Sequence, residues 1–256
     1  MQSTINFPVE EKALRTSDGI NVTEAKAIVR TDTNGVLGIV GKDYKLIKHA
    51  DVLHTLESHI PTELNLSRVE LCKNGAILFA HYDTPKLKPI EVKVGDIVSF
   101  GVEIFNSYNG MLKVGFMIVA NRLKCTNGMI VPESLAVISQ KHTGELDAED
   151  IEEKFSQRVP LFLRAANKWS EWSEFTPDAA AIADFFKKHL GKRLMAELTD
   201  RFKAEEDQSL WGLFNLLTYY RTHQIKLRET NKENKRLAQM HFDENVIAPF
   251  YDFSWR

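Results

Sequence analysis

Histidines are the first residues to test for metal binding or catalysis, and three of them fall in one predicted helix. His49, His54 and His59 are spaced five residues apart. Two histidines that bind one metal ion from a helix stand three or four residues apart, so that they share a face. A spacing of five distributes these side chains around the helix, and the remaining histidines are isolated in sequence. We therefore expect no metal site and no cofactor.

Nucleophile and phosphate-loop motifs do not indicate an enzyme. The sequence contains neither a G-x-S-x-G elbow nor a G-x-x-x-x-G-K-[ST] loop. The carboxylates at 145–153 crowd the start of one predicted helix, where they favour the helix dipole. We expect no catalytic residues. An enzyme site around Cys125, Asn127 and Asn106 is the third alternative, because Cys125 precedes a tight turn that would expose its thiol.

A stretch without acidic residues is the clearest sign of a binding site. No Asp or Glu occurs from Ile104 to Pro132, although the formal net charge of the chain is −2. A polyanion site in such a chain must come from local segregation of charge. Single-stranded nucleic acid binds to cations that contact its phosphates and to aromatic rings that stack on its bases. The predicted nucleic-acid-binding residues are Arg30, Tyr44, Lys73, Tyr108, Lys113, Arg122 and Lys124.

The strand that contains Lys113 should present a small, semi-polar face. Alternate residues of a strand share a face, so Lys113, Gly115, Met117, Val119 and Asn121 lie together. Glycine in the middle of a strand occurs where another backbone or a ligand approaches closely. We expect this face to be uncovered and to present its cations to a negatively charged ligand. The alternative is that the aromatic residues nearby belong to the core.

Residues 1–140 show the pattern of short strands. Three hairpins are predicted, each with Asn-Gly in its turn: 25–31 with 36–40, 69–72 with 76–81, and 97–105 with 113–123. A short strand over 44–47 and a helix over 49–59 complete this half. We predict that residues 1–140 form a β-rich domain with one helix.

Residues 141–256 show helical periodicity. Helices are expected over 147–172, with Pro160 as a kink or division, over 179–190, over 194–202, over 209–225 and over 231–242. Thr176 is the expected N-cap of the second helix and Gly191 its C-cap. Strands followed by helices predict an α+β fold, in which a mostly antiparallel sheet is covered or followed by a helical layer. We expect 141–256 to pack on the sheet as one unit.

The overall composition of the chain limits the classes of protein to which it can belong. The 256 residues are 43% hydrophobic and 27% charged, which is ordinary for a soluble globular chain. No apolar run approaches the roughly 20 residues that span a bilayer, and the N-terminus lacks a signal-peptide pattern. We expect a cytoplasmic protein without membrane contact. Its two cysteines, Cys72 and Cys125, should therefore stay reduced.

Three segments together resemble one known family. They are Ala27–Tyr44, then Asn106–Gly110 with Arg122–Gly128, and finally the run W-G-L-F-N-L-L-T-Y-Y-R-T-H at Trp211–His223. In this order they are similar to a family of phage and plasmid proteins, a domain of unknown function usually labelled phage/plasmid-like protein. The resemblance implies the product of a mobile element in a host cell. It implies no catalytic residues.

Two functions follow as expectations. The leading hypothesis is a non-enzymatic DNA-binding protein that binds or anneals single strands in recombination or replication, working as a homo-oligomer. The alternative is an interaction module or inhibitor that targets a host protein. It rests on the aromatic residues at 169–175 and 250–255, because exposed aromatic side chains mark interfaces.

Overall fold

Contacts within the chain divide it into two compact units. The computed structural model describes residues 5–122, 127–130, 137–144, 147–225 and 235–255. Unit 1 comprises 1–86, 102–117 and 137–157, and unit 2 comprises 87–101, 118–136 and 158–256. The division runs through β7 (Asp96–Ser107), β8 (Val114–Arg122) and α4 (Ala148–Glu174). It cuts across the predicted division at 140/141, whereas the succession of strands and then helices confirms the α+β class.

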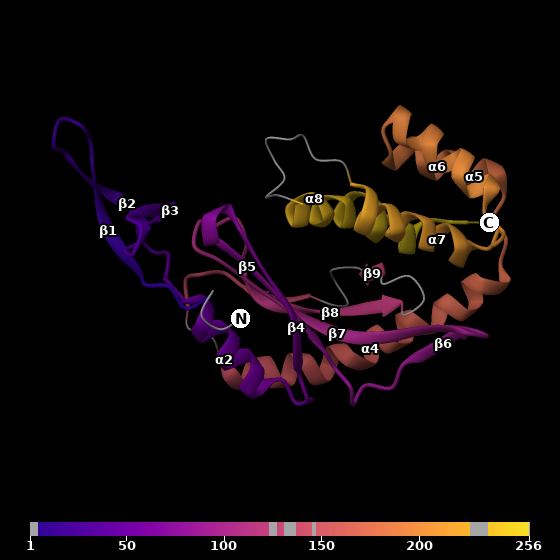
Figure 1. The fold of residues 1–256 in the computed structure, drawn as a ribbon, viewed down its shortest axis with the longest axis horizontal. Coiled ribbons are helices and arrows are strands. Elements are labelled where there is room, and N and C mark those ends of the chain that lie inside the picture. The colour runs from indigo at the N-terminus through magenta and orange to yellow at the C-terminus, as the bar shows by residue number, and fades with distance from the viewer. Residues whose placement is uncertain (1–4, 123–126, 131–136, 145–146, 226–234, 256) are drawn as a thin grey trace. The chain divides into compact units, whose positions relative to one another are not determined.

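A small antiparallel sheet opens unit 1 (Figure 1). Its strands are β1 (Val9–Arg15), β2 (Asn21–Arg30) and β3 (Gly35–Gly41), paired in that order. The predicted hairpin over 25–31 and 36–40 is confirmed, and Asn34 takes a left-handed conformation in its turn (φ 53°). Strand β1 was not predicted, because its adjacent charges Glu10, Glu11 and Lys12 hide the alternation of a strand.

The larger sheet passes through both units, and its unit 1 part holds the predicted hairpins. Here β4 (Asn65–Cys72) and β5 (Ile77–Asp83) form a hairpin through the 3-10 turn η1 (Lys73–Gly75). Across the sheet, β5 is followed by residues 102–107 of β7, then by residues 114–117 of β8, and then by β10 (Val137–Gln140). Helix α2 (His49–His59) matches the prediction. The start of α4 packs on this sheet through Phe155, whose ring lies 5.9 Å from that of Phe116.

The predicted strand over 44–47 is wrong. Tyr44 closes a turn by donating its N–H to the carbonyl of Gly41 at 3.0 Å, and residues 45–48 form no strand. The N–H of Lys45 bonds to the carbonyl of His142 at 2.6 Å. Separate bonds hold this segment, from Nδ2 of Asn106 to the carbonyl of Ile47 and between Lys45 and His142, and they do not form the ladder of a paired strand.

Unit 2 combines the other part of the larger sheet with most of the helices. Its strands are β6 (Ile90–Lys93), residues 96–101 of β7, 118–122 of β8 and β9 (Asn127–Ile130). The remaining elements, beside the end of α4, are α5 (Ala179–His189), α6 (Lys192–Ala204), α7 (Leu210–Tyr219), the π-helix η2 (Tyr220–Gln224), α8 (Lys235–Phe242), the π-helix η4 (Asp243–Ile247) and α9 (Ala248–Asp252). Trp169, Trp211, Phe214 and Phe250 are fully buried among them.

Helix boundaries differ from the predictions at specific residues. Pro160 lies inside α4, which continues past it. Asp178, and not Thr176, is the N-cap of α5. That helix ends at His189 with Leu190 as its C-cap, so Gly191 is not the C-cap of α5 but the N-cap of α6. The φ of Gly191 is −67°, so this glycine does not supply the left-handed C-terminal conformation that the prediction assumed.

The predicted uncovered face of β8 is wrong. Every residue from Val114 to Ala120 is buried, which includes Gly115, Met117 and Val119 on the face that was expected to be open. A Cβ added to Gly115 would lie 2.1 Å from the carbonyl oxygen of Ile138. The glycine therefore admits a neighbouring backbone, that of β10, and not a ligand.

No helix within the described ranges is long and apolar enough to cross a bilayer.

Candidate nucleic-acid interface

A buried histidine organises one end of the larger sheet in unit 1. The His49 ring stacks on Tyr108 with 3.9 Å between ring centroids. Its Nε2 lies 3.0 Å from the carbonyl oxygen of Gly75, and its Nδ1 lies 2.9 Å from Nδ2 of Asn106. Burial lowers the pKa of His49 to about 4, so the imidazole is neutral at physiological pH. We call His49, Gly75, Asn106 and Tyr108 the His49 cluster.

Three predicted cations converge on the His49 cluster. The guanidinium of Arg30 lies 4.1 Å from the ring centroid of Phe7, which in turn makes edge contacts with the rings of His49 and Tyr108. Lys73 stands two residues before Gly75, in η1. Lys113 follows the turn after Tyr108, which Ser107 closes by donating its hydroxyl to the carbonyl of Leu112 at 2.8 Å. The segments that carry these three cations thus adjoin the His49 cluster, although they are far apart in sequence.

The three cations differ in how far they are neutralised. Arg30 forms an ion pair with Asp32 at 2.7 Å. Lys73 and Lys113 are exposed, and neither forms an ion pair with any described residue. The latter two are therefore the predicted cations that a phosphate group can reach without competing with a carboxylate.

Tyr108 does not offer a surface for a base. Its side chain is 1% exposed, and its hydroxyl oxygen accepts the backbone N–H of His49 at 2.7 Å. Burial raises its pKa to about 12. Tyr108 therefore supports the turn that precedes Lys113, and the prediction that it stacks on nucleic-acid bases is wrong for this conformation.

Tyr44 is half-buried and lines a cavity that is open to solvent. Its ring stacks on His142 with 4.5 Å between centroids and 14° between planes. Its hydroxyl donates to the carbonyl of Ser107 at 2.5 Å, and burial raises its pKa. His142 was not predicted, since it is isolated in sequence. It is buried, burial lowers its pKa, and its Nε2 has no partner among the described residues.

The cavity beside Tyr44 has a volume of about 910 Å³ and is open to solvent. Two of its cations are paired, Lys26 with Glu11 and Lys42 with Glu24, both at 2.8 Å. The lining residues come from the small sheet, the 42–47 segment, α2 and the turn after His142: Glu11, Lys26, Lys42, Asp43, Tyr44, Lys45, Leu46, Ile47, Asp51, Thr55, Thr143 and Gly144. The lining holds three cations and three carboxylates. Such a balanced cavity suits a neutral, hydrogen-bonding ring better than a phosphate. We call it the Tyr44 cavity.

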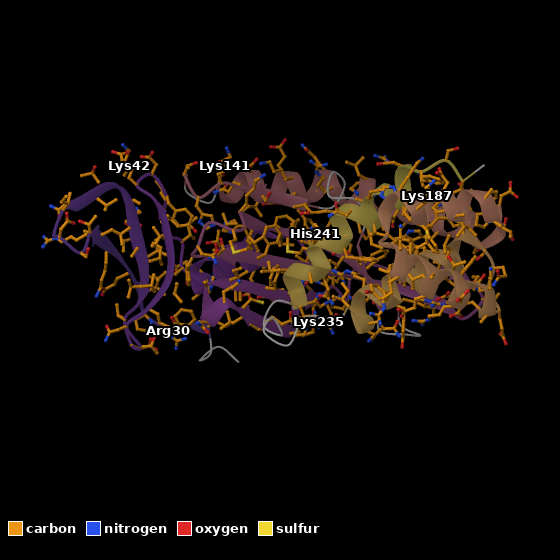
Figure 2. The ribbon with its side chains drawn as sticks, turned by 90° about the horizontal axis from the view of Figure 1, so that it is seen from above. Arg30, Lys42, Lys141, Lys187, Lys235 and His241 are labelled. Atoms are coloured by element: carbon orange, nitrogen blue, oxygen red, sulfur yellow. The ribbon has the colours of Figure 1, made fainter. Side chains whose placement is uncertain are left out.

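The Tyr44 cavity and the His49 cluster use cations from different ends of the small sheet. Arg30 ends β2 and Lys42 follows β3, so the two residues stand at opposite ends of the small sheet (Figure 2). Lys42 belongs to the Tyr44 cavity, and Arg30 belongs to the His49 cluster.

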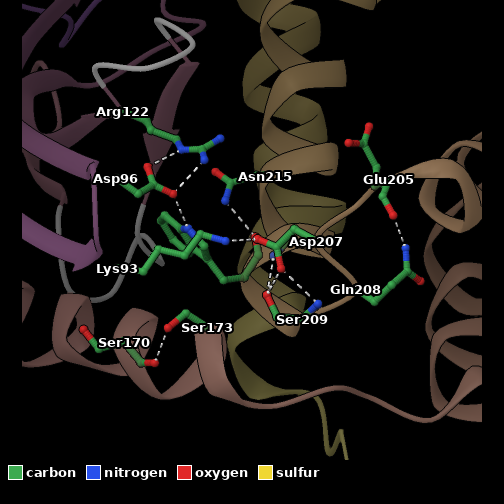
Figure 3. A network of polar contacts seen from close by, with 12 residues as sticks. Lys93, Asp96, Arg122, Ser170, Ser173, Glu205, Asp207, Gln208, Ser209 and Asn215 are labelled. Carbon is green, nitrogen blue, oxygen red and sulfur yellow. Dashed lines mark hydrogen bonds and ion pairs between the residues drawn. The ribbon is translucent and has the colours of Figure 1, made fainter.

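Arg122 is a structural residue of unit 2. Its Nε and Nη2 donate to the two carboxylate oxygens of Asp96 at 2.5 and 2.6 Å (Figure 3). Trp211 donates its indole N–H to Oδ2 of Asp96 at 2.8 Å. Burial alone would raise the pKa of Asp96, but these hydrogen bonds outweigh it and lower the pKa. Arg122 is thus already bound to a buried carboxylate, and a phosphate would have to compete with Asp96 for it; its role as a phosphate contact stays a prediction.

A second carboxylate holds the start of α7 in unit 2. Asp207 accepts Nζ of Lys93 and the hydroxyl of Ser209, both at 2.5 Å (Figure 3). Ser209 is the N-cap of α7 and accepts the N–H of Gly212 at 3.1 Å. A Cβ on Gly212 would lie 2.1 Å from the carbonyl oxygen of Asp207. Trp211 therefore fixes α7 to the carboxylate of Asp96, whereas Gly212 allows the backbone of Asp207 to approach the start of the helix.

Two residues named in the predictions lie outside the described part of the chain. Lys124 and Cys125 lie outside the described residues, so the thiol of the enzyme alternative has no described surroundings. Asn106, the third member of that alternative, is buried and donates its amide to the carbonyl of Ile47 at 2.9 Å. Within the described ranges, no group of three or more His, Cys, Asp or Glu side chains is arranged to hold a metal ion.

The chain matches the family model "Domain of unknown function (DUF932)" over residues 36–241. This span covers most of the sequence, and the chain belongs to that family. It runs from β3 to α8 and so includes the His49 cluster and the contacts of Asp96 with Arg122 and Trp211. Comparison with curated proteins and with solved structures gives no match.

Proposed function

We propose that the protein binds single-stranded DNA without catalysing a reaction, and that it does so as the product of a phage or plasmid. The observation that supports this most is the Tyr44 cavity, which has an aromatic wall and as many carboxylates as cations, in the same unit as the exposed Lys73 and Lys113. Bases need a stacking surface and hydrogen-bonding groups, whereas phosphates need cations. In unit 1 the two kinds of group are separated, with Tyr44 in the cavity and Lys73 and Lys113 at the His49 cluster.

Charge segregation supports the same function. Unit 1 contains more Asp and Glu than Lys and Arg, so its overall field does not attract DNA. Lys73 and Lys113 are nevertheless without carboxylate partners among the described residues. Binding would therefore be local and of moderate strength, and it would weaken steeply with salt because each phosphate contact releases counterions. Single-strand binding and annealing during recombination or replication is the role that we assign.

The direct test is fluorescence anisotropy with a labelled oligo(dT) strand at about 50 mM salt, where phosphate contacts are strongest. We expect Lys73→Gln with Lys113→Gln to weaken binding at least about tenfold. Lys12→Gln with Lys88→Gln is the matched control, since both lysines are exposed, neither forms an ion pair with a described residue, and the net charge changes equally. Equal binding by the two double variants would assign no role to Lys73 and Lys113. No binding by the unmodified protein would reject the function.

A second candidate function is an interaction module for a host protein. The predicted support for it is wrong, because Trp169, Trp172, Phe250 and Trp255 are buried. Strand β3 of the small sheet offers better support, because its Val36 and Ile39 are each more than 60% exposed. Exposed apolar side chains grouped on one element are typical of protein interfaces. Affinity capture of one stoichiometric host protein, lost with Val36→Lys and Ile39→Lys and unaccompanied by oligonucleotide binding, would favour this candidate.

A further inference from the structure

A run of cations connects α5 to α6 in unit 2, in the sequence K-K-H-L-G-K-R at 187–193. Lys187, Lys188, Lys192 and Arg193 are all exposed, and we call these four residues the basic connection. Lys188 pairs with Asp184 at 2.8 Å and lies 5.4 Å from the ring centroid of Phe253. The other three form no ion pair with any described residue. Lys187 is labelled in Figure 2.

Helix stability explains only half of this run. Lys187 and Lys188 stand in the last turn of α5, where cations favour the helix dipole. Lys192 and Arg193 stand in the first turn of α6, where cations oppose it. That turn contains no acidic residue, and its N-cap Gly191 supplies no side-chain hydrogen bond. Two unpaired cations at the N-terminus of a helix are unfavourable for stability, because they lie at the positive end of the helix dipole. Such unfavourable positions are expected where a residue serves function and not stability.

The surroundings of Lys192 and Arg193 indicate a ligand of moderate size. They line a cavity of about 380 Å³ with Gly191, Leu194, Glu197 and Tyr220. Glu197 is the carboxylate among the lining residues and offsets one of the two cations. Tyr220 opens the π-helix η2, and such helices frequently occur at functional sites. The aromatic ring and the cations together form a surface for a group that carries both phosphate and an apolar or planar part.

Composition points to the same ligand class. Unit 2 contains more Lys and Arg than Asp and Glu, the reverse of unit 1. We infer that the basic connection is a second, independent contact surface for the phosphodiester backbone of single-stranded nucleic acid. This inference rests on the proposed function for its ligand, but its surface and its residues are different. Each unit would thus have a phosphate-contacting surface of its own.

The first experiment measures oligo(dT) affinity and its salt dependence for a triple variant, Lys187→Gln, Lys192→Gln and Arg193→Gln. We expect affinity to fall at least about tenfold, and the slope of log K against log salt to become shallower by about 2, because each single-strand phosphate contact contributes about 0.7. The matched control replaces Lys12, Lys88 and Lys203 by Gln, which removes the same charge from exposed lysines that form no ion pair with a described residue. Equal losses in the two triple variants would overturn the inference.

A second experiment separates this inference from the proposed function. Inorganic tripolyphosphate should raise the melting temperature of the unmodified protein more than that of the triple variant, which keeps Lys73 and Lys113. This result would uphold the anion surface even if oligo(dT) did not bind, whereas equal stabilisation of the two proteins, or stabilisation of neither, would overturn it. Vesicles of phosphatidylserine and phosphatidylcholine provide the competing polyanion. Loss of vesicle binding without loss of oligo(dT) binding in the triple variant would also overturn it.

A third experiment distinguishes function from structure. Lys192→Glu places an acid in the first turn of α6, three and four residues before the uncharged Met195 and Ala196, so it should raise the melting temperature by about 1–3 °C. The same variant should bind oligo(dT) more weakly. A residue with a structural role would show the opposite, with lower stability. A fall in melting temperature together with unchanged affinity would reject the assignment of Lys192.

Discussion

Trp211 donates its indole N–H to Oδ2 of Asp96 at 2.8 Å, and Asp96 receives Arg122 on both oxygens at the same time. A single buried carboxylate thereby fixes β7, β8 and α7 within unit 2. The desolvation of Asp96 is compensated only while all three donors are present, because a buried charge without partners is strongly unfavourable.

Asp96→Asn should therefore destabilise the protein by about 3–5 kcal/mol, because Arg122 would be left without its counter-ion in a buried site. Urea unfolding followed by tryptophan fluorescence measures this change. Lys93→Met is the control, since the ion pair of Lys93 with Asp207 is partly exposed and should contribute less than about 1 kcal/mol. Similar losses in the two variants would contradict the role assigned to Asp96.

His49 should make stability depend on pH in a defined window. Its pKa is about 4 in the folded state and ordinarily 6.5, so the unfolded state binds the extra proton between these values. Stability is present in full above pH 6.5 and falls as the pH drops toward 4, by about 3 kcal/mol in total. His142, whose pKa is also lowered, acts in the same direction.

Comparison with His49→Gln isolates this contribution. The variant should lose stability at pH 7, but its free energy of unfolding should fall less between pH 6.5 and 4.5 than that of the unmodified protein. Carboxylates contribute equally to both and cancel in the difference. Parallel pH profiles would show that His49 is not neutral and buried in the folded protein.

Two glycines should resist substitution because a backbone occupies the place of their side chain. A Cβ on Gly38 would lie 2.5 Å from the Cα of Asn109, and one on Gly115 would lie 2.1 Å from the carbonyl oxygen of Ile138. We expect either Gly→Ala change to cost about 1–3 kcal/mol or more, as overpacking does. Gly41→Ala, which meets no atom within 4 Å, should be close to neutral in the same thermal unfolding assay. Tolerance of Gly115→Ala would contradict the pairing of β8 with β10.

Much of the fold was predictable from the sequence, because the local signals for turns and helices agree with the tertiary structure. The Asn-Gly turns located three hairpins, and α2 was predicted over His49–His59 as it is found. Strand β1 was missed because its charges break the alternation. The end of α5 was misplaced because Gly191 caps the following helix.

The candidate site was less predictable, for a physical reason. Arg122 and Tyr108 have the residue types of a nucleic-acid contact, but their availability depends on partners distant in sequence. Asp96 neutralises Arg122, and His49 covers Tyr108. Conversely, Lys192 and Arg193 were not predicted, although their signal was present: two cations begin a helix that has no acid in its first turn.

Tyr44 should contribute to binding through its ring and not its hydroxyl. Tyr44→Phe removes the bond to Ser107 and keeps the ring, so oligo(dT) affinity should change little. Tyr44→Leu removes the aromatic surface and should weaken binding by about 1–3 kcal/mol, the contribution of one stacked base. Anisotropy gives both values, and far-UV circular dichroism controls for folding. Equal affinity of the Phe and Leu variants would exclude base stacking at the Tyr44 cavity.

The most direct test of the central claim is the salt dependence of binding of the unmodified protein to labelled oligo(dT). A protein that contacts phosphates from both units should bind at about 50 mM salt and lose affinity steeply and linearly on a log–log scale by about 200 mM. Absence of binding at 50 mM, or an affinity that does not change with salt, would contradict the account.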